Sequence, residues 1–397
     1  MANPDEPSLP GSVDTLDRYP APKAAPNWEK DPFPGVLDAL KAHLQTAVLL
    51  ESYTIPMYLF AYYSIKDPDA NAKKILRISK EEMLHLGLAG NILRSIGGTP
   101  SLHQYAPEFP QELFYDKVKL NLKPATKETI ETFVAVERPG KMPVDDDVYI
   151  LLKDYKSIGE FYKEVKKGIR AVAKRKSDLF DPTTAGKQFK QGDGSWHAPE
   201  MKAITDVKSA ICALELIIVQ GEGSIEGDEI ECTDLPTGEP HFTTFSNLLG
   251  SYNFKVTDVV ENIDSKYYKD EKFYEALIAC DAIYSYLLLS IEKLWQYDPG
   301  NEEARKEVIG KNVRGLMAHA LGPLAKFLVK QPLSSNAKKF AAPPFRKYNF
   351  TSDKLALGQL EELMRQTVAK YANDPEKGDL EKIQKSVKDL VSLDKLK

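Results

Sequence analysis

Apolar residues recur at spacings of three and four along most of the chain, which is the pattern of helices that bury one face. The first two runs cover residues 36–66 and 70–96, and Asp67-Pro68-Asp69 between them supplies a turn and a helix start. Two further runs cover residues 157–173 and 204–219. The pattern predicts two helical hairpins, which together make a four-helix bundle.

A long crossover joins the two predicted hairpins. Residues 100–147 contain many prolines and little periodicity apart from the apolar run at 133–136, which leaves room for one short helix. After His241 the helical spacing returns, and no run alternates with period two as strands do. The predicted fold class is therefore all-α, with additional C-terminal helices near residues 243–263, 271–296, 302–330, 352–372 and 377–393.

The chain divides into three parts along its length. Residues 1–33 hold seven prolines and few large apolar side chains, so we expect an extended or disordered N-terminal arm. Residues 34–250 make up the predicted bundle. Residues 251–397 are predicted to form a helical region that packs on the bundle.

Composition and charge exclude several classes of partner. The chain has 42% hydrophobic and 28% charged residues and a net charge of -5, without a long basic run, so we expect no nucleic-acid partner and no anionic membrane surface. The apolar stretch at 278–291 is interrupted by Asp281 and is shorter than a membrane span. The N-terminus lacks the apolar core of a secretory signal, so we expect a cytoplasmic protein.

The three cysteines, Cys212, Cys232 and Cys280, show no metal-binding or redox spacing. Their odd number argues against a disulfide framework. We therefore expect them to be buried as small hydrophobic side chains.

The sharpest chemical signal is Glu82-Met83-Leu84-His85, preceded by Glu81. Residues three apart share a helix face, so Glu82 and His85 can both point inward. Glu-x-x-His is the unit from which dinuclear iron and manganese carboxylate sites in four-helix bundles are built. Taken alone the motif is frequent by chance on solvated helices, so it needs partners.

Glu51 is the first partner, because it lies in an apolar segment where an unpaired carboxylate would be costly to bury. Glu51 precedes the Asp67 turn by about 16 residues and Met83 follows it by about 16, so in an antiparallel hairpin the groups lie level. Pro56 follows Glu51 closely and removes one helix hydrogen bond, which predicts a kink and room for a substrate.

The second hairpin offers three further carboxylates. Glu160 could be a ligand or could complete a capping box with Ser157. Glu215 and Glu222 are seven residues apart, about 10 Å along a helix, so only one of them can serve the same metals. Glu222 lies between Gly221 and Gly223 at a helix end level with Glu160. We therefore prefer Glu222 as the metal ligand and keep Glu215 as the alternative.

Histidine is scarce, with six residues in the chain. His241 follows the glycine-rich segment after Glu222 and can begin a helix that points back at the site. His43 lies about two turns from Glu51 and is expected in the core or beside the ligands. His103, His197 and His319 are expected to be surface or packed histidines.

Several of these motifs together resemble one known family. The chain is similar to the ferritin-like family named after the iminophenyl-pyruvate dimer synthase of bisindole pigment pathways. The similarity is carried by residues 43–56, 81–85, 91–98, 157–162 and 220–223, and more weakly by 317–328. The synthases carry this domain within a much longer chain, and the segment before His241 differs from the family's usual Ser-His.

The resemblance implies a ferritin-like four-helix bundle with two iron ions per chain, or manganese in their place. Carried over by position, it implies the metal ligands Glu51, Glu82, His85, Glu160, Glu222 and His241. Oxygen and imidazole ligands suit these metals better than soft thiolate-binding metals.

Three functions from different classes fit this reading. The first is a non-heme di-iron oxidoreductase that takes O2 and a small organic substrate, for example an amino- or keto-acid-derived metabolite, with Tyr53, Tyr58 and Tyr62 as walls of the substrate pocket. The second is an imine-coupling synthase of the type that the resemblance names. The third is a non-catalytic iron-handling protein, since a fold alone does not define a function. The substrate and the oligomeric state are not legible in the sequence.

Overall fold

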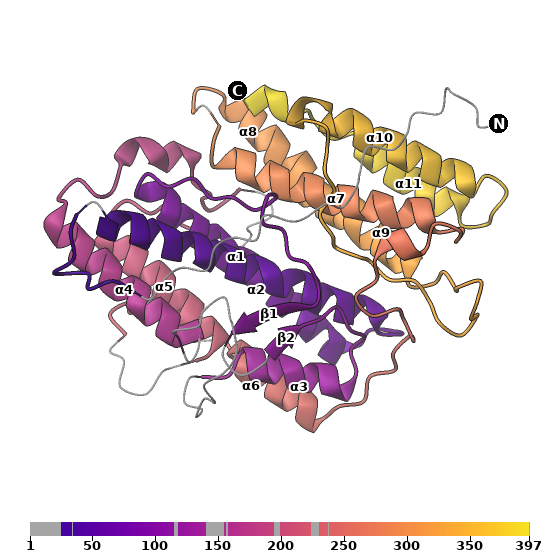
Figure 1. The fold of residues 1–397 in the computed structure, drawn as a ribbon, viewed down its shortest axis with the longest axis horizontal. Helices are drawn as coiled ribbons and strands as arrows, with labels where there is room; N and C mark the ends of the chain where they lie inside the picture. Colours follow the sequence, from indigo (N-terminus) through magenta and orange to yellow (C-terminus); the bar gives the residue numbers. More distant parts are fainter. Residues whose placement is uncertain are drawn as a thin grey trace.

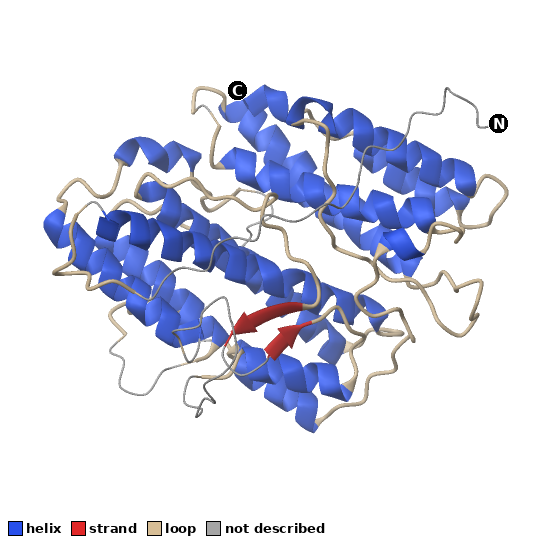
Figure 2. Cartoon of the chain, viewed as in Figure 1, coloured by secondary structure: helices blue, strands red, loops and turns tan. Residues whose placement is uncertain are grey.

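The computed structural model describes residues 25–33, 35–114, 118–139, 155, 158–193, 199–223, 230–236, 238–297 and 299–396. Most of the predicted N-terminal arm, and also Ser157 and His197, lie outside these residues. The regular secondary structure of the described residues is almost entirely helical, which confirms the all-α fold class (Figures 1 and 2).

Four long helices form the predicted bundle. Helices α1 (Gly35–Ser64) and α2 (Ala70–Ser95) make the first hairpin, and α4 (Ile158–Arg175) and α5 (Val207–Gly221) make the second. Helix α1 also packs on α4, and α2 on α5, so the hairpins close into one core. Asp69 and Asp206 cap α2 and α5 by accepting backbone N–H groups of the first turn, which fixes where the two helices begin.

The crossover between the hairpins contains the short helix α3 (Lys127–Val136) and a small antiparallel hairpin of β1 (Gln111–Phe114) and β2 (Val118–Leu120). The sequence does not predict this hairpin, because segments this short carry no readable alternation. Helix α3 packs on α6 (His241–Gly250). The helix predicted for residues 243–263 is wrong beyond Gly250, after which the backbone is irregular.

The C-terminal helices gather on one side of the bundle (Figure 1). Helix α7 (Tyr274–Leu294) is their centre, and its apolar window is long enough to cross a membrane but is 83% buried under neighbouring helices, as the core helix of a globular protein is. The remaining helical elements are α8 (Glu302–Val308), the π-helical turns η3 (Ile309–Gly315) and η4 (Met317–Leu321), α9 (Gly322–Leu328), α10 (Asp353–Lys370), α11 (Lys377–Lys388), and the short 3-10 turns η1 (Pro182–Lys187), η2 (Ser265–Tyr267) and η5 (Leu393–Leu396).

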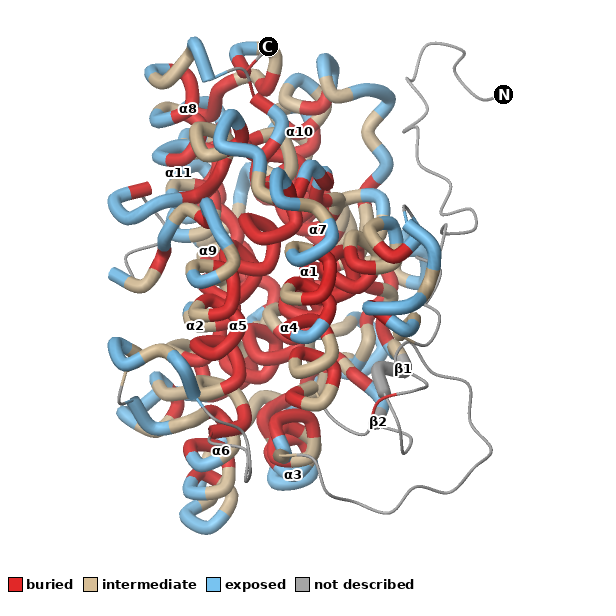
Figure 3. Tube along the Cα trace, turned by 90° about the vertical axis from the view of Figure 1, so that its left-hand side faces the viewer, coloured by how far each residue is buried: buried red, intermediate tan, exposed pale blue. Residues whose placement is uncertain are grey.

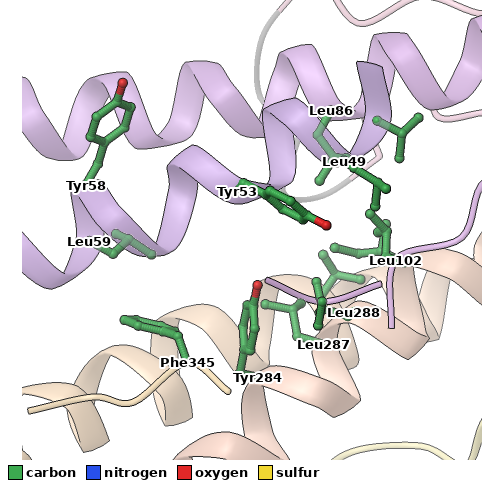
Figure 4. Close-up of a cluster of buried hydrophobic side chains, with 14 of the residues drawn as sticks. Leu49, Tyr53, Tyr58, Leu59, Leu86, Leu102, Tyr284, Leu287, Leu288 and Phe345 are labelled. Atoms are coloured by element: carbon green, nitrogen blue, oxygen red, sulfur yellow. The ribbon is translucent and has the colours of Figure 1, made fainter. Parts of the chain in front are cut away.

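The C-terminal helices and the bundle share a continuous apolar contact. Figure 3 shows that most residues of α7 and of α1 are buried. Figure 4 shows Leu49 and Tyr53 of α1 turned toward Tyr284 and Leu287 of α7, whereas Tyr58 points to the other side of α1. The C-terminal region is therefore packed tightly against the first hairpin.

Cys212 on α5 and Cys232 form a disulfide, with a Cα–Cα distance of 5.6 Å, which corrects the expectation of three reduced cysteines. Only Cys280 is a free thiol, and it is buried as predicted. An odd count of cysteines excludes complete pairing but does not exclude one pair, and the separation of 20 residues gave no signal of its own.

Candidate metal centre

The Glu-x-x-His unit of α2 faces the interior of the bundle. Glu82 and His85 are 3% and 1% exposed, and they lie one helical turn apart. Glu51 of α1 is also buried, and its Oε2 lies 3.4 Å from His85 Nδ1. Tyr162 of α4 donates its hydroxyl to the other oxygen of Glu51. The level placement of Glu51 and the α2 motif across the first hairpin is thus what the positions relative to the Asp67 turn predict.

His241 enters the same cluster from a different element. It is the first residue of α6, as expected, and its ring stacks on that of His85 with 5.4 Å between centroids. The Glu82 carboxylate is divided between the two rings, since its Oε1 lies 3.0 Å from His241 Nδ1 and its Oε2 lies 3.6 Å from His85 Nδ1. Glu82 therefore stands between two separate nitrogen donors.

Glu137 is the cluster residue that sequence reasoning missed. It directly follows α3, it is buried, and its Oε2 lies 3.7 Å from His241 Nδ1. Tyr58 of α1 donates its hydroxyl to the other oxygen of Glu137. The signal that could have pointed to Glu137 is a lone carboxylate at the end of the apolar run at 133–136. Its place in the cluster depends on the packing of α3, which the sequence does not specify.

The three candidates of the second hairpin have different surroundings. Glu222, at the end of α5, is buried, lines the cavity beside Glu51 and Glu82, and accepts the backbone N–H of Gly159. Glu215 instead forms a buried ion pair with Lys166 at 2.7 Å and accepts two backbone N–H groups. Glu160 lies half-buried in the first turn of α4 and is not among the described residues that line the cavity.

The three tyrosines predicted as substrate walls are buried, and none of them is among the described residues that line this cavity. Tyr53 donates to the Tyr105 carbonyl, and Tyr62 packs edge-on against Tyr63. Tyr58 reaches the cluster through its hydrogen bond to Glu137. A direct substrate contact of these side chains stays a prediction.

His43 and His103 have partners outside the cluster. His43 packs against Trp28 and Phe161 in the core and contacts the Tyr155 hydroxyl. His103 contacts the Tyr348 carbonyl. His85 and His241 are therefore the imidazoles available to a metal within the described residues.

Burial and neighbouring charges shift the pKa values of the carboxyl and imidazole groups in this cluster. Burial raises the pKa of Glu51 to about 7, against the opposing hydrogen bond from His85. Burial also disfavours the charged form of Glu82, but hydrogen bonds from His241 and His85 outweigh it and lower the pKa of that carboxyl. For His85, burial opposes protonation, yet Glu51 and Glu82 raise its pKa to about 10. Positive charge close to the buried carboxylates therefore stabilises their ionised forms.

The donor set fits a pair of divalent metal ions. All of the donor residues except His241 line a cavity of about 20 Å³, which has room for small ions or a water molecule. The buried His241 Nδ1 lies 3.0 Å from Glu82 Oε1 and 3.7 Å from Glu137 Oε2, so a metal ion bound there would replace the proton that these carboxylates favour on the ring. When all four are ionised, the carboxylates of Glu51, Glu82, Glu137 and Glu222 carry four negative charges, which two divalent ions would balance.

A family model agrees with this architecture. A family model described as Ferritin-like matches residues 44–250, which include the cluster. Among solved structures, a ferritin-like protein from Caulobacter vibrioides matches with 24% sequence identity and a TM-score of 0.49, over 64% of this chain and 86% of that protein. No curated protein gives a significant match.

Proposed function

The chain belongs to the ferritin-like family, and from this premise we propose that it is an O2-dependent oxidoreductase that holds two iron ions and acts on a small organic molecule. The observation that carries the proposal is the division of the Glu82 carboxylate between His85 and His241. A shared carboxylate flanked by one imidazole and one further carboxylate on each side is the arrangement that two neighbouring ions need.

Glu51, Glu82, Glu137, Glu222, His85 and His241 would hold the ions. Their oxygen and imidazole donors suit iron or manganese and disfavour metals that prefer thiolates. When bound in its reduced state, iron supplies electrons for the reduction of O2.

The surrounding residues orient the cluster and keep it dry. Tyr162 and Tyr58 donate to Glu51 and Glu137, and burial keeps the pKa of both phenols well above its usual value, so both hydroxyls stay protonated donors at neutral pH. Each hydrogen bond leaves the second oxygen of its carboxylate facing a histidine. Leu50, Ile158 and Ile217 line the cavity with apolar surface, which limits the entry of water.

A second candidate function, iron oxidation without an organic substrate, is favoured by the size of the cavity. As lined by the described residues, the cavity of about 20 Å³ beside the ligands accommodates a molecule as small as water but no amino- or keto-acid-derived metabolite. An organic substrate would need the surrounding side chains to move. The narrower kinship with iminophenyl-pyruvate dimer synthases is supported by the shared motifs alone.

Metal analysis tests the proposed function. We expect protein purified without added metal to contain two iron ions per chain, and its optical spectrum to change when air is admitted to the reduced form. Glu82→Ala and His85→Ala should lose the metal and remain helical, because the apolar faces of the bundle supply most of its stability. A content of one zinc per chain, or unchanged metal content in both variants, would contradict the proposal.

Oxygen consumption separates the two candidate functions. Turnover of O2 that depends only on added ferrous iron would favour iron oxidation. Turnover that depends on an amino or keto acid, at constant protein-bound iron, would favour the oxidoreductase. A Tyr58→Phe variant would show whether the phenol beside Glu137 contributes to either reaction.

A further inference from the structure

The two histidines of the cluster are held in the same orientation by oxygen atoms behind them. His85 Nε2 donates to Gln220 Oε1 at 2.8 Å, and His241 Nε2 donates to Glu81 Oε2 at 3.2 Å. Both partner atoms are acceptors, so Nε2 carries the hydrogen in each ring. Nδ1 of each ring therefore faces the Glu82 carboxylate.

Apart from Glu222, which has no counterpart, the rest of the two half-sites is closely matched. His85 is accompanied by Glu51, which accepts from Tyr162, and His241 is accompanied by Glu137, which accepts from Tyr58. Glu82 contributes one oxygen to each half. The two half-sites differ in the group that accepts the hydrogen bond from Nε2 of the imidazole, because Gln220 is neutral and Glu81 is a carboxylate.

Glu81 is fixed in place from its other side. Arg77 donates to Glu81 Oε1 at 3.1 Å and to the Thr244 hydroxyl at 3.0 Å, which ties α2 to α6. The Arg77 side chain is 40% exposed, so water screens its charge. Glu81 is 23% exposed and its Oε2 points at the ring, so the carboxylate acts on the imidazole at short range.

Resting on the proposed function, we infer that Glu81 and Gln220 are positioning residues that make the two metal positions unequal. An anionic acceptor behind an imidazole makes the ring a stronger donor to a metal than a neutral amide does. The position at His241 is the tighter one, and the position at His85 is the weaker one. Removal of such an anionic partner typically lowers metal affinity by about 10- to 100-fold.

Cobalt titration tests this difference without relying on activity. The full-length protein, freed of metal with a chelator, is titrated with Co²⁺ while the absorption of the bound ion is followed. We expect two steps, of which the tighter is lost in His241→Ala and the weaker in His85→Ala. Glu81→Gln keeps a hydrogen-bond acceptor but removes the charge, and it should weaken only the tighter step, by about 10- to 100-fold.

A second variant should change metal affinity in the opposite direction. Gln220→Glu places a carboxylate behind His85 and should tighten only the weaker step. Glu131→Gln removes the same charge at an exposed position on α3 and should leave both steps unchanged. Circular dichroism of each variant shows that a changed step does not reflect lost helix.

Failure of the inference differs from failure of the proposed function. Two ions bound with equal affinity, or a Glu81→Gln effect on the His85 step, would overturn the inequality and leave a dinuclear site standing. Binding of no metal by the unchanged protein would overturn both. A two-step titration in which Glu81→Gln and Gln220→Glu shift different steps in opposite directions supports the inference.

Discussion

At the scale of single residues, Glu137 holds the place in the cluster that the family resemblance implies for Glu160. Glu137 is buried and directs one oxygen toward His241 and the other toward Tyr58. Glu160 is half-buried and starts α4. The geometry therefore favours Glu137 of the crossover over Glu160 of the bundle as a metal ligand.

Paired substitutions distinguish the two carboxylates. Glu137→Gln should lose at least one of the two metal ions, because it removes a charged donor beside His241 and leaves Tyr58 with a neutral partner. Glu160→Gln is the matched control, and it should keep the full metal content. Elemental analysis of both purified variants gives the answer, and loss of metal only in Glu160→Gln would restore the assignment that the resemblance implies.

Several members of the cluster could be predicted from local rules. Helical spacing alone places Glu82 and His85 on one face, and equal distances from the Asp67 turn place Glu51 level with them. Glu137 could not be predicted in this way. It follows a crossover without periodicity, and its position is set by the contact of α3 with α6, which is a tertiary property.

At the scale of elements, the disulfide ties the segment between α5 and α6 to α5. Cys232 is joined to Cys212, and Glu215 accepts the backbone N–H groups of Glu231 and Cys232. The segment carries a cluster residue at each end, Glu222 and His241. Its attachment therefore constrains the distance between two elements of the site.

Reduction of the disulfide should lower the free energy of unfolding by about 3 kcal/mol, because a closed loop of roughly this length restricts the unfolded chain. Guanidinium unfolding with and without a phosphine reductant measures the effect. The denatured protein should show one reactive thiol before reduction and three after it. Three reactive thiols without reduction would mean that the pair is not formed in solution.

Helix α7 carries a buried carboxyl, Asp281, which accepts the backbone N–H of Arg346. Burial raises its pKa well above the usual value, with Arg346 opposing and Asp264 reinforcing the shift. As pH rises through the ordinary range of an aspartate, the carboxyl of Asp281 loses its proton in the unfolded chain but keeps it in the folded protein. The free energy of unfolding therefore falls as pH rises from that range toward the raised pKa of Asp281.

Asp281→Asn keeps an acceptor for Arg346 and cannot ionise. Relative to the unchanged protein, the variant should gain stability as pH rises from about 4 to 8. Urea unfolding at several pH values measures the difference, and a gap between the two proteins that does not change with pH would show that Asp281 is not held neutral.

Most of the helices could be predicted from the sequence. Long apolar periodicity predicted the four bundle helices to within a few residues, because each buries one face against its neighbours. The errors lie where the period is short or broken. The β1–β2 hairpin is too short to alternate, and the backbone after Gly250 contains apolar residues that pack without helical structure.

At the scale of the whole molecule, the C-terminal helices dock on the bundle next to the helix that carries the Glu-x-x-His motif. Trp295, at the end of α7, is completely buried against α2 and donates its indole N–H to Asn91 at 3.2 Å. Arg305 of α8 forms a buried bidentate pair with Asp193 of the bundle side. Most of α7 itself is buried, and this burial explains why the helix is so apolar.

Gly90 makes this docking possible, because a Cβ atom there would lie 2.1 Å from a ring carbon of Trp295. Gly90→Ala should therefore destabilise the protein by about 1–3 kcal/mol, although alanine is the better helix former. Gly358→Ala is the matched control inside α10, where nothing lies within 4 Å of the added atom, and it should stabilise by about 0.5–1 kcal/mol. Chemical denaturation compares the two. Because the two changes are chemically identical, opposite signs isolate the contact with Trp295, and a stabilising Gly90→Ala would mean that the C-terminal helices do not press on α2.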